Sequence, residues 1–175
     1  MEQNVSMKIN ELPSPTWNWL KVNETPIKWS NKIEPCEIAA EGDAVATETE
    51  QLSDIETGAG READAIFATE NTAKYQILAD NAGQDKTVRL HISGKKDAHT
   101  AGCVEIVAKE NSTLTVVMDS RVAPDATKEE ESTAEASLAV RVRMKVESGA
   151  SVRLIQVQMP QEHETLLSDI GGDLI

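Results

Sequence analysis

The sequence has few aromatic residues, few cysteines and no long apolar run. Aromatics make up 3% of its 175 residues, so a core must be built mainly from valine, isoleucine, leucine and alanine. Its two cysteines, Cys36 and Cys103, lack CxxC spacing, which argues against a structural disulfide. No apolar run approaches the roughly 18 residues that a membrane span needs, and residues 1–10 lack a leader pattern. We therefore expect a cytoplasmic protein with no membrane association.

Basic residues are outnumbered by acidic ones. The chain has 17 Lys and Arg against 30 Asp and Glu, a formal net charge of −13. Because nucleic-acid binding needs clustered Lys and Arg, no nucleic-acid partner is expected. Ten of the acidic residues lie in residues 34–64, where Arg61 is the single basic residue. This composition predicts an acidic linker.

A short turn followed by a β-branched run occurs twice. Asn111-Ser112 precedes one such run and Gly149-Ala150 the other, and the two turns are 38 residues apart. A weaker third copy of the turn is suggested by Glu70-Asn71-Thr72. A fixed period of this length is typical of units that cannot bury their own apolar face and must stack on their neighbours.

Alternation with period two predicts strands over much of the second half. Val88, Leu90 and Ile92 share one face of a strand. Further strands are predicted at 65–69, 74–78, 103–107, 114–118, 138–146 and 152–157. A positive stripe consists of Arg141, Arg143, Lys145 and Arg153. It is either a solvated strand face or a surface that meets an acidic block, which belongs to a partner or to residues 34–64.

These strands are joined by turns without helical patterns between them, which excludes a doubly wound α/β fold. The repeat favours an all-β solenoid in which matching strands stack in parallel, and an antiparallel sandwich remains the alternative. A short helix is expected near the N-terminus, because Ser14 is a suitable N-cap with Pro15 after it. The expected organisation is an N-terminal tryptophan-containing helical segment (1–33), the acidic linker (34–64) and a β-helix core (65–175).

No grouping of residues predicts a reaction. His91, His99 and Cys103 have metal-binding side chains, but their intervals of eight and four match no established ligand spacing. His91 is better interpreted as a solvent-facing strand residue and Cys103 as a small apolar one. The sequence has no phosphate-binding glycine loop and no nucleophile elbow. We predict no catalytic residue, no metal site and no cofactor, so the protein is not expected to be an enzyme.

The tryptophan segment 12–24, the repeated strands 108–119 and 149–158, and the closing segment 163–172 resemble the SufB/SufD family in order and rough spacing. These proteins are scaffold subunits of the bacterial Suf system for iron-sulfur cluster assembly. The resemblance implies an N-terminal helical region, a right-handed parallel β-helix and a C-terminal helical domain that docks on SufC, an ATP-hydrolysing subunit, in a SufBCD complex. It also implies cluster assembly at the SufB–SufD interface, by Cys and His side chains near the C-terminal end of the solenoid.

The chain ends at Ile175, where a family member is expected to be in the middle of its β-helix, so no functional residue is carried over. The resemblance implies a non-catalytic scaffold or accessory subunit that acts through protein contacts. The expected partners are a SufB/SufD-like subunit, a SufC-like ATPase and a second copy of the chain. The alternative is a stand-alone small-molecule-binding or enzymatic β-sandwich domain, which would need a closed apolar pocket.

Overall fold

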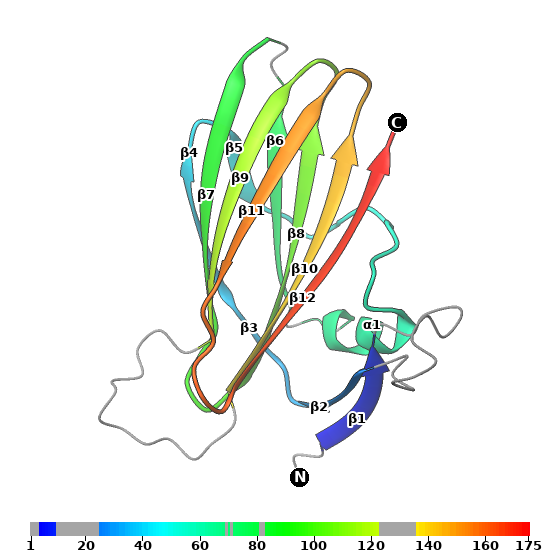
Figure 1. The fold of residues 1–175 in the computed structure, drawn as a ribbon, viewed down its shortest axis with the longest axis vertical. Helices are drawn as coiled ribbons and strands as arrows, with labels where there is room; N and C mark the ends of the chain where they lie inside the picture. Colours follow the sequence, from blue (N-terminus) through cyan, green and yellow to red (C-terminus); the bar gives the residue numbers. More distant parts are fainter. Residues whose placement is uncertain (1–3, 10–24, 69, 71, 81–82, 123–135) are drawn as a thin grey trace, which may run out of the picture.

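The structure is a computed structural model that describes residues 4–9, 25–68, 70, 72–80, 83–122 and 136–175. Within these ranges it contains twelve strands and one short helix (Figure 1). In chain order they are β1 (Asn4–Ile9), β2 (Thr25–Ser30), β3 (Glu34–Pro35), β4 (Glu37–Gly42), β5 (Val45–Glu48), α1 (Arg61–Phe67), β6 (Ala73–Ala79), β7 (Asp85–Ser93), β8 (His99–Ala108), β9 (Thr113–Arg121), β10 (Ala136–Val146), β11 (Ser151–Gln158) and β12 (Glu164–Leu174).

Two sheets face each other and enclose the main core (Figure 1). The six-stranded sheet has the order β12-β10-β8-β6-β5, and β3 also pairs with β8. The four-stranded sheet has the order β11-β9-β7-β4. From β6 to β12 the chain alternates between the sheets, and all neighbours in this stretch pair in parallel. At one end, β5 and β4 pair antiparallel with β6 and β7.

The predicted right-handed parallel β-helix is wrong. The strands form three separate sheets with antiparallel pairs in each, the third being the β1–β2 hairpin, and no closed solenoid is found among the described residues. Residues 34–64, which were expected to be a linker, contribute β3, β4 and β5. The helix predicted at Ser14 and Pro15 lies outside the described residues. The described helix is α1, which overlaps residues 65–69, where a strand was predicted.

The 38-residue repeat of the sequence does correspond to strand pairing. Ser137 on β10 lies opposite His99 on β8, 38 residues away, and β11 pairs with β9 at the same offset. The other parallel pairs between β6 and β12 have smaller offsets: 28 residues for β7–β9 and β10–β12, and 29 for β6–β8. The connection from β9 to β10 is longer than those from β7 to β8 and from β11 to β12, which accounts for the larger offset.

Three turns stack at one end of the sheets, and each contains a residue with left-handed backbone. Their φ angles are 77° at Gly83, 58° at Asn111 and 68° at Gly149. Gly83 N–H donates to Asn111 O at 3.1 Å, and Asn111 N–H donates to Ser148 O at 3.1 Å. The third copy of the turn therefore lies at Gly83. Asn71 of the copy predicted at residues 70–72 lies outside the described residues, and the strand that follows it, β6, pairs with β8 and not with β9.

Gly149 allows the last two turns to stack closely. A Cβ atom there would lie 2.3 Å from Oδ1 of Asn111, in addition to the strain of a positive φ. We expect Gly149→Ala to lower the free energy of unfolding by about 1–2 kcal/mol. Urea denaturation measures the loss. Gly172→Ala is the control, because its nearest neighbouring atoms are at 3.4 Å, and an equal loss in both variants would contradict the stacking argument.

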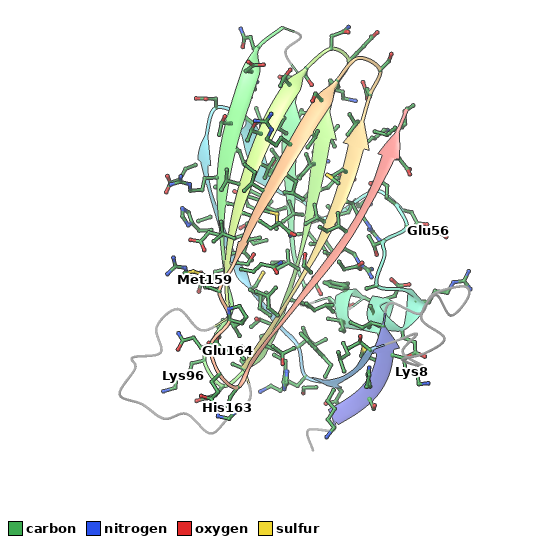
Figure 2. The ribbon with its side chains drawn as sticks, viewed as in Figure 1. Lys8, Glu56, Lys96, Met159, His163 and Glu164 are labelled. Atoms are coloured by element: carbon green, nitrogen blue, oxygen red, sulfur yellow. The ribbon has the colours of Figure 1, made fainter. Side chains whose placement is uncertain are left out.

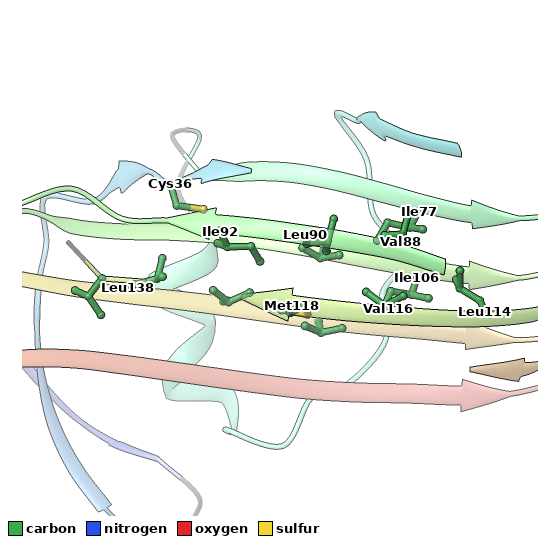
Figure 3. Close-up of a cluster of buried hydrophobic side chains, with 14 of the residues drawn as sticks. Cys36, Ile77, Val88, Leu90, Ile92, Ile106, Leu114, Val116, Met118 and Leu138 are labelled. Carbon is green, nitrogen blue, oxygen red and sulfur yellow. The ribbon is translucent and has the colours of Figure 1, made fainter. Parts of the chain in front are cut away.

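The main core lies between the sheets and consists of aliphatic side chains from alternate strand positions (Figure 3). Val88, Leu90 and Ile92 of β7 are at most 1% exposed, as the period-two pattern predicted. The labelled layer also includes Cys36, Ile77, Ile106, Leu114, Val116, Met118 and Leu138. The core is thus built from thin layers of valine, leucine and isoleucine, as the small number of aromatic residues predicted.

A second cluster covers the opposite face of the six-stranded sheet. In α1 the buried residues are Ala63, Ile66 and Phe67, whose spacing places them on one helical face. They pack with Trp29 of β2 and Cys103 of β8 in the same cluster. The six-stranded sheet is therefore covered on both faces, with β1, β2 and α1 on its outer side (Figure 1).

Candidate functional site

The two sheets end differently at their two edges. At one end the edge strands are β4, with six residues, and β5, with four, and both run antiparallel to their neighbours. At the other end the edge strands are β11, with eight residues, and β12, with 11, and both continue the parallel stack. Short edge strands offer few backbone groups for further pairing, whereas long regular ones invite it. The β11–β12 end is thus the open end of the two sheets.

Several large apolar side chains are exposed at this open end. Ile155 and Val157 of β11 are 43% and 39% exposed, Met159 is 61% exposed, and Leu174 of β12 is 87% exposed. Figure 2 shows Met159 close to the turn that leads into β12. A long parallel edge flanked by exposed apolar side chains is suited to pairing or packing with another chain.

At the open end, a pair of hydrogen-bonded polar side chains, Gln156 and Ser168, partly covers the core between the two sheets. Leu90, Met118 and Gln156 occupy matching positions on β7, β9 and β11, so this inward-facing row changes from apolar to polar at the edge. Gln156 Nε2 donates to Ser168 Oγ of β12 at 2.9 Å, across the gap between the sheets. Leu154 and Leu166 beside them are only partly buried. The core thus reaches the edge without being fully covered there.

The loop between β5 and α1, residues 49–60, crosses the outer face of the six-stranded sheet and is called the strap here. Arg143 of β10 donates from Nη1 to Ser53 O at 2.7 Å and from Nε to Ile55 O at 3.1 Å. Gly58 N–H donates to Ile170 O of β12 at 3.1 Å. A Cβ atom on Gly171 would lie 1.9 Å from Glu56 O, so the strap rests directly on the strand. Figure 2 shows Glu56 on the strap beside β12.

Asp169 of β12 holds the end of the strap. Its carboxylate accepts hydrogen bonds from Thr57 Oγ1 at 2.6 Å, from Ala59 N–H at 2.8 Å and from Arg141 Nε at 2.7 Å. Arg141 also pairs through Nη1 with Asp64 of α1 at 2.8 Å, and its guanidinium lies 4.2 Å from the centroid of the Phe67 ring. A buried ion pair therefore joins β10, β12, the strap and α1.

Glu105 of β8 holds the other end of the strap. Its carboxylate accepts from Ser53 N–H at 2.8 Å and from Gln76 Nε2 at 2.6 Å. Burial opposes its ionisation, but these hydrogen bonds and the nearby Arg143 outweigh burial and lower the pKa of Glu105. The ionised form is therefore the one that the fold stabilises.

The lowered pKa of Glu105 predicts a loss of stability in acid. A carboxylate with a depressed folded-state pKa stabilises the fold above its unfolded pKa, near about 4.3 for glutamate, and this contribution disappears as the pH falls through the folded pKa. We expect Glu105→Gln to lose less unfolding free energy than wild type between about pH 6 and about pH 3. Urea denaturation at each pH measures this. Exposed Glu37→Gln is the charge-matched control, and identical pH profiles for Glu105→Gln and wild type would refute the prediction.

The structure separates the three side chains considered as metal ligands. His91 lies on the four-stranded sheet, 3.5 Å from Glu41 and 3.9 Å from Asp119. His99 begins β8, where its ring lies 5.9 Å from that of Trp29, and Cys103 is buried beneath the strap. Among the described residues no group of three or more His, Cys, Asp or Glu is placed to hold a metal ion.

The positive stripe divides into two parts. Arg141 pairs with Asp64 and Arg143 binds strap carbonyls, which confirms the interpretation that the stripe meets residues 34–64. Arg153 is exposed, as expected for a solvated strand face. Sequence reasoning missed Asp169, because its partnership with Arg141 depends on the register of β10 and β12.

No protein-family model, curated protein or solved structure matches this chain. In the part of the chain that the structure describes, no helix is both long enough and apolar enough to cross a membrane.

Proposed function

We propose that the chain is a non-catalytic scaffold or accessory subunit of SufB/SufD type, which supports iron-sulfur cluster assembly in the cytoplasm through protein contacts. The choice of pathway rests on the resemblance carried by residues 12–24, 108–119, 149–158 and 163–172. The observation that carries a role in protein contact is the open end of the two sheets.

The open end favours a partner that adds strands. β11 has a neighbour on one side only among the described strands, so it presents backbone donors and acceptors along its free edge. β12 also has one neighbouring strand, but the strap already occupies part of its other edge, where Gly58 N–H donates to Ile170 O. Strand addition satisfies these groups, and the exposed side chains of Ile155 and Val157 provide apolar contact beside them. The partners that fit are a SufB/SufD-like subunit and a second copy of the chain, with a SufC-like ATPase joining the same assembly.

The proposal is tested by co-expression with a SufB/SufD-like subunit, followed by gentle anaerobic purification of the tagged chain. The double variant Ile155→Lys/Val157→Lys places two charges on the open edge. We expect it to lose the partner and any self-association, because the charged side chains would have to be desolvated on binding. Val45→Lys is the matched control, since Val45 is 51% exposed on β5 at the opposite end.

Two results would count against the proposal. Purification of the unmodified chain alone, as a monomer, would remove the case for a scaffold. Equal loss of the partner in the Val45→Lys variant would remove the case for the open end. Circular dichroism of each variant establishes that the fold is retained before either result is interpreted.

A further inference from the structure

A charged cleft of about 1240 Å³ lies between the strap and α1, over the outer face of the six-stranded sheet. Its floor comes from neighbouring strands: Lys74 on β6 is opposite Cys103 on β8, which is opposite Arg141 on β10. Arg143, two positions along β10 on the same face, also lines the cleft. The floor therefore gathers three cations around one thiol.

One of these cations does not use all of its hydrogen-bonding capacity. Arg141 is occupied at Nε by Asp169 and at Nη1 by Asp64, but its buried Nη2 has no acceptor. Arg143 donates to two backbone carbonyls, and no described carboxylate lies within ion-pair distance of it. A buried guanidinium nitrogen without an acceptor is unusual, because burying an unpaired charged donor is costly.

Other groups on the floor do not supply the missing acceptor. Burial raises the pKa of the Cys103 thiol, and the opposing effects of Arg141, Arg143 and Lys74 do not reverse this, so the thiol is neutral at physiological pH. The cleft thus has an unused cationic donor on its floor.

We propose that this cleft binds a small oxyanion, held by Nη1 and Nη2 of Arg141 and by Arg143. The anion takes the place of Asp64, whose side chain is 59% exposed and reaches Arg141 from α1. A guanidinium group binds two oxygens of a carboxylate or phosphate in a fork, so Nη2 gains the acceptor that it lacks. Asp169 remains on Nε and keeps the arginine in place.

The rim of the cleft restricts what can enter. Glu50, Asp54 and Glu56 line it from the strap and are exposed. These carboxylates repel large polyanions, whereas a small anion that reaches the floor lies against Arg141 and Arg143. Because the rim charges are in contact with solvent, their repulsion weakens as salt screens it.

The test is isothermal titration calorimetry with sodium phosphate and, separately, sodium acetate, at constant ionic strength set with sodium chloride. We expect saturable binding at one site. Asp64→Asn, which removes the competing carboxylate, is expected to bind about tenfold more tightly, and Arg143→Gln about tenfold more weakly. Lys145→Gln is the matched control, because it removes one positive charge from β10 outside the cleft and leaves binding unchanged.

Each result decides the question. Tighter binding of phosphate points to a phosphate-type ligand and tighter binding of acetate to a carboxylate, and both support the oxyanion site. The site is refuted if neither anion saturates the wild type or Asp64→Asn. It is also refuted if Lys145→Gln weakens binding as much as Arg143→Gln does. None of these outcomes depends on a protein partner, so they leave the scaffold proposal to its own experiment.

Discussion

Replacing Asp169 with alanine is expected to lower the free energy of unfolding by about 3–5 kcal/mol. The residue is 1% exposed, and its carboxylate accepts hydrogen bonds from Arg141, Thr57 and Ala59. Its removal leaves the buried guanidinium of Arg141 without its best-shielded partner and detaches the strap at two points. Breaking one side of a buried ion pair costs far more than removing a surface charge. Urea unfolding followed by circular dichroism measures the loss.

Two further variants separate the ion pair from its surroundings. Asp173→Ala removes an exposed carboxylate from the same strand and is expected to change the free energy of unfolding by at most about 0.5 kcal/mol. Thr57→Val removes only one of the three hydrogen bonds, and a loss of about 1 kcal/mol is expected. If Asp169→Ala were no more destabilising than Asp173→Ala, the ion pair would not hold the strap to the sheet.

The strands of the second half were predictable because their signal is local. In β7 the alternation of Val88, Leu90 and Ile92 with polar residues follows from one face of the strand lying in the core. The 38-residue repeat likewise marked the turns at Asn111 and Gly149, which do stack. These features need no knowledge of a distant partner.

The rest of the fold depends on distant contacts or on weak local signals. In β4, Ile38 and Ala40 pack against the core, but an alternation made largely of alanine and glutamate looks like a linker. The strand predicted at 65–69 is wrong because Ala65-Ile66-Phe67 is too short to distinguish a strand from a helix. β4 and β5 run antiparallel to their neighbours and end the parallel stack, but the amino-acid composition of these two strands does not reveal their direction.

The charged site was predictable only in part. The alternation in β10 placed Arg141 and Arg143 on one face, and the acidic block suggested where their partners would be found. Asp64 of that block is indeed a partner of Arg141. Asp169 and Glu105 belong to other strands, and they reach the same face only after β8, β10 and β12 have paired in their particular register.

Replacing Leu90 with alanine is expected to lower the free energy of unfolding by about 2–5 kcal/mol. Its side chain is fully buried on β7 between the two sheets (Figure 3), so truncation removes apolar burial and leaves a cavity that close-packed neighbours fill poorly. Urea denaturation gives the change in free energy. An unchanged denaturant slope in the same experiment shows that the unfolded state is not altered.

Leu154→Ala makes the same chemical change at the open end and serves as the comparison. Leu154 packs against the same core but is only partly buried, because no described strand covers the free edge of β11. Its truncation is therefore expected to cost less than that of Leu90 in the isolated chain. If the proposed partner or a second copy covers the edge, the side chain is expected to become fully buried, and its truncation is expected to weaken the assembly. Equal costs for Leu90→Ala and Leu154→Ala in the monomer would mean that the core is already closed at β11, which would leave strand addition without its apolar contribution.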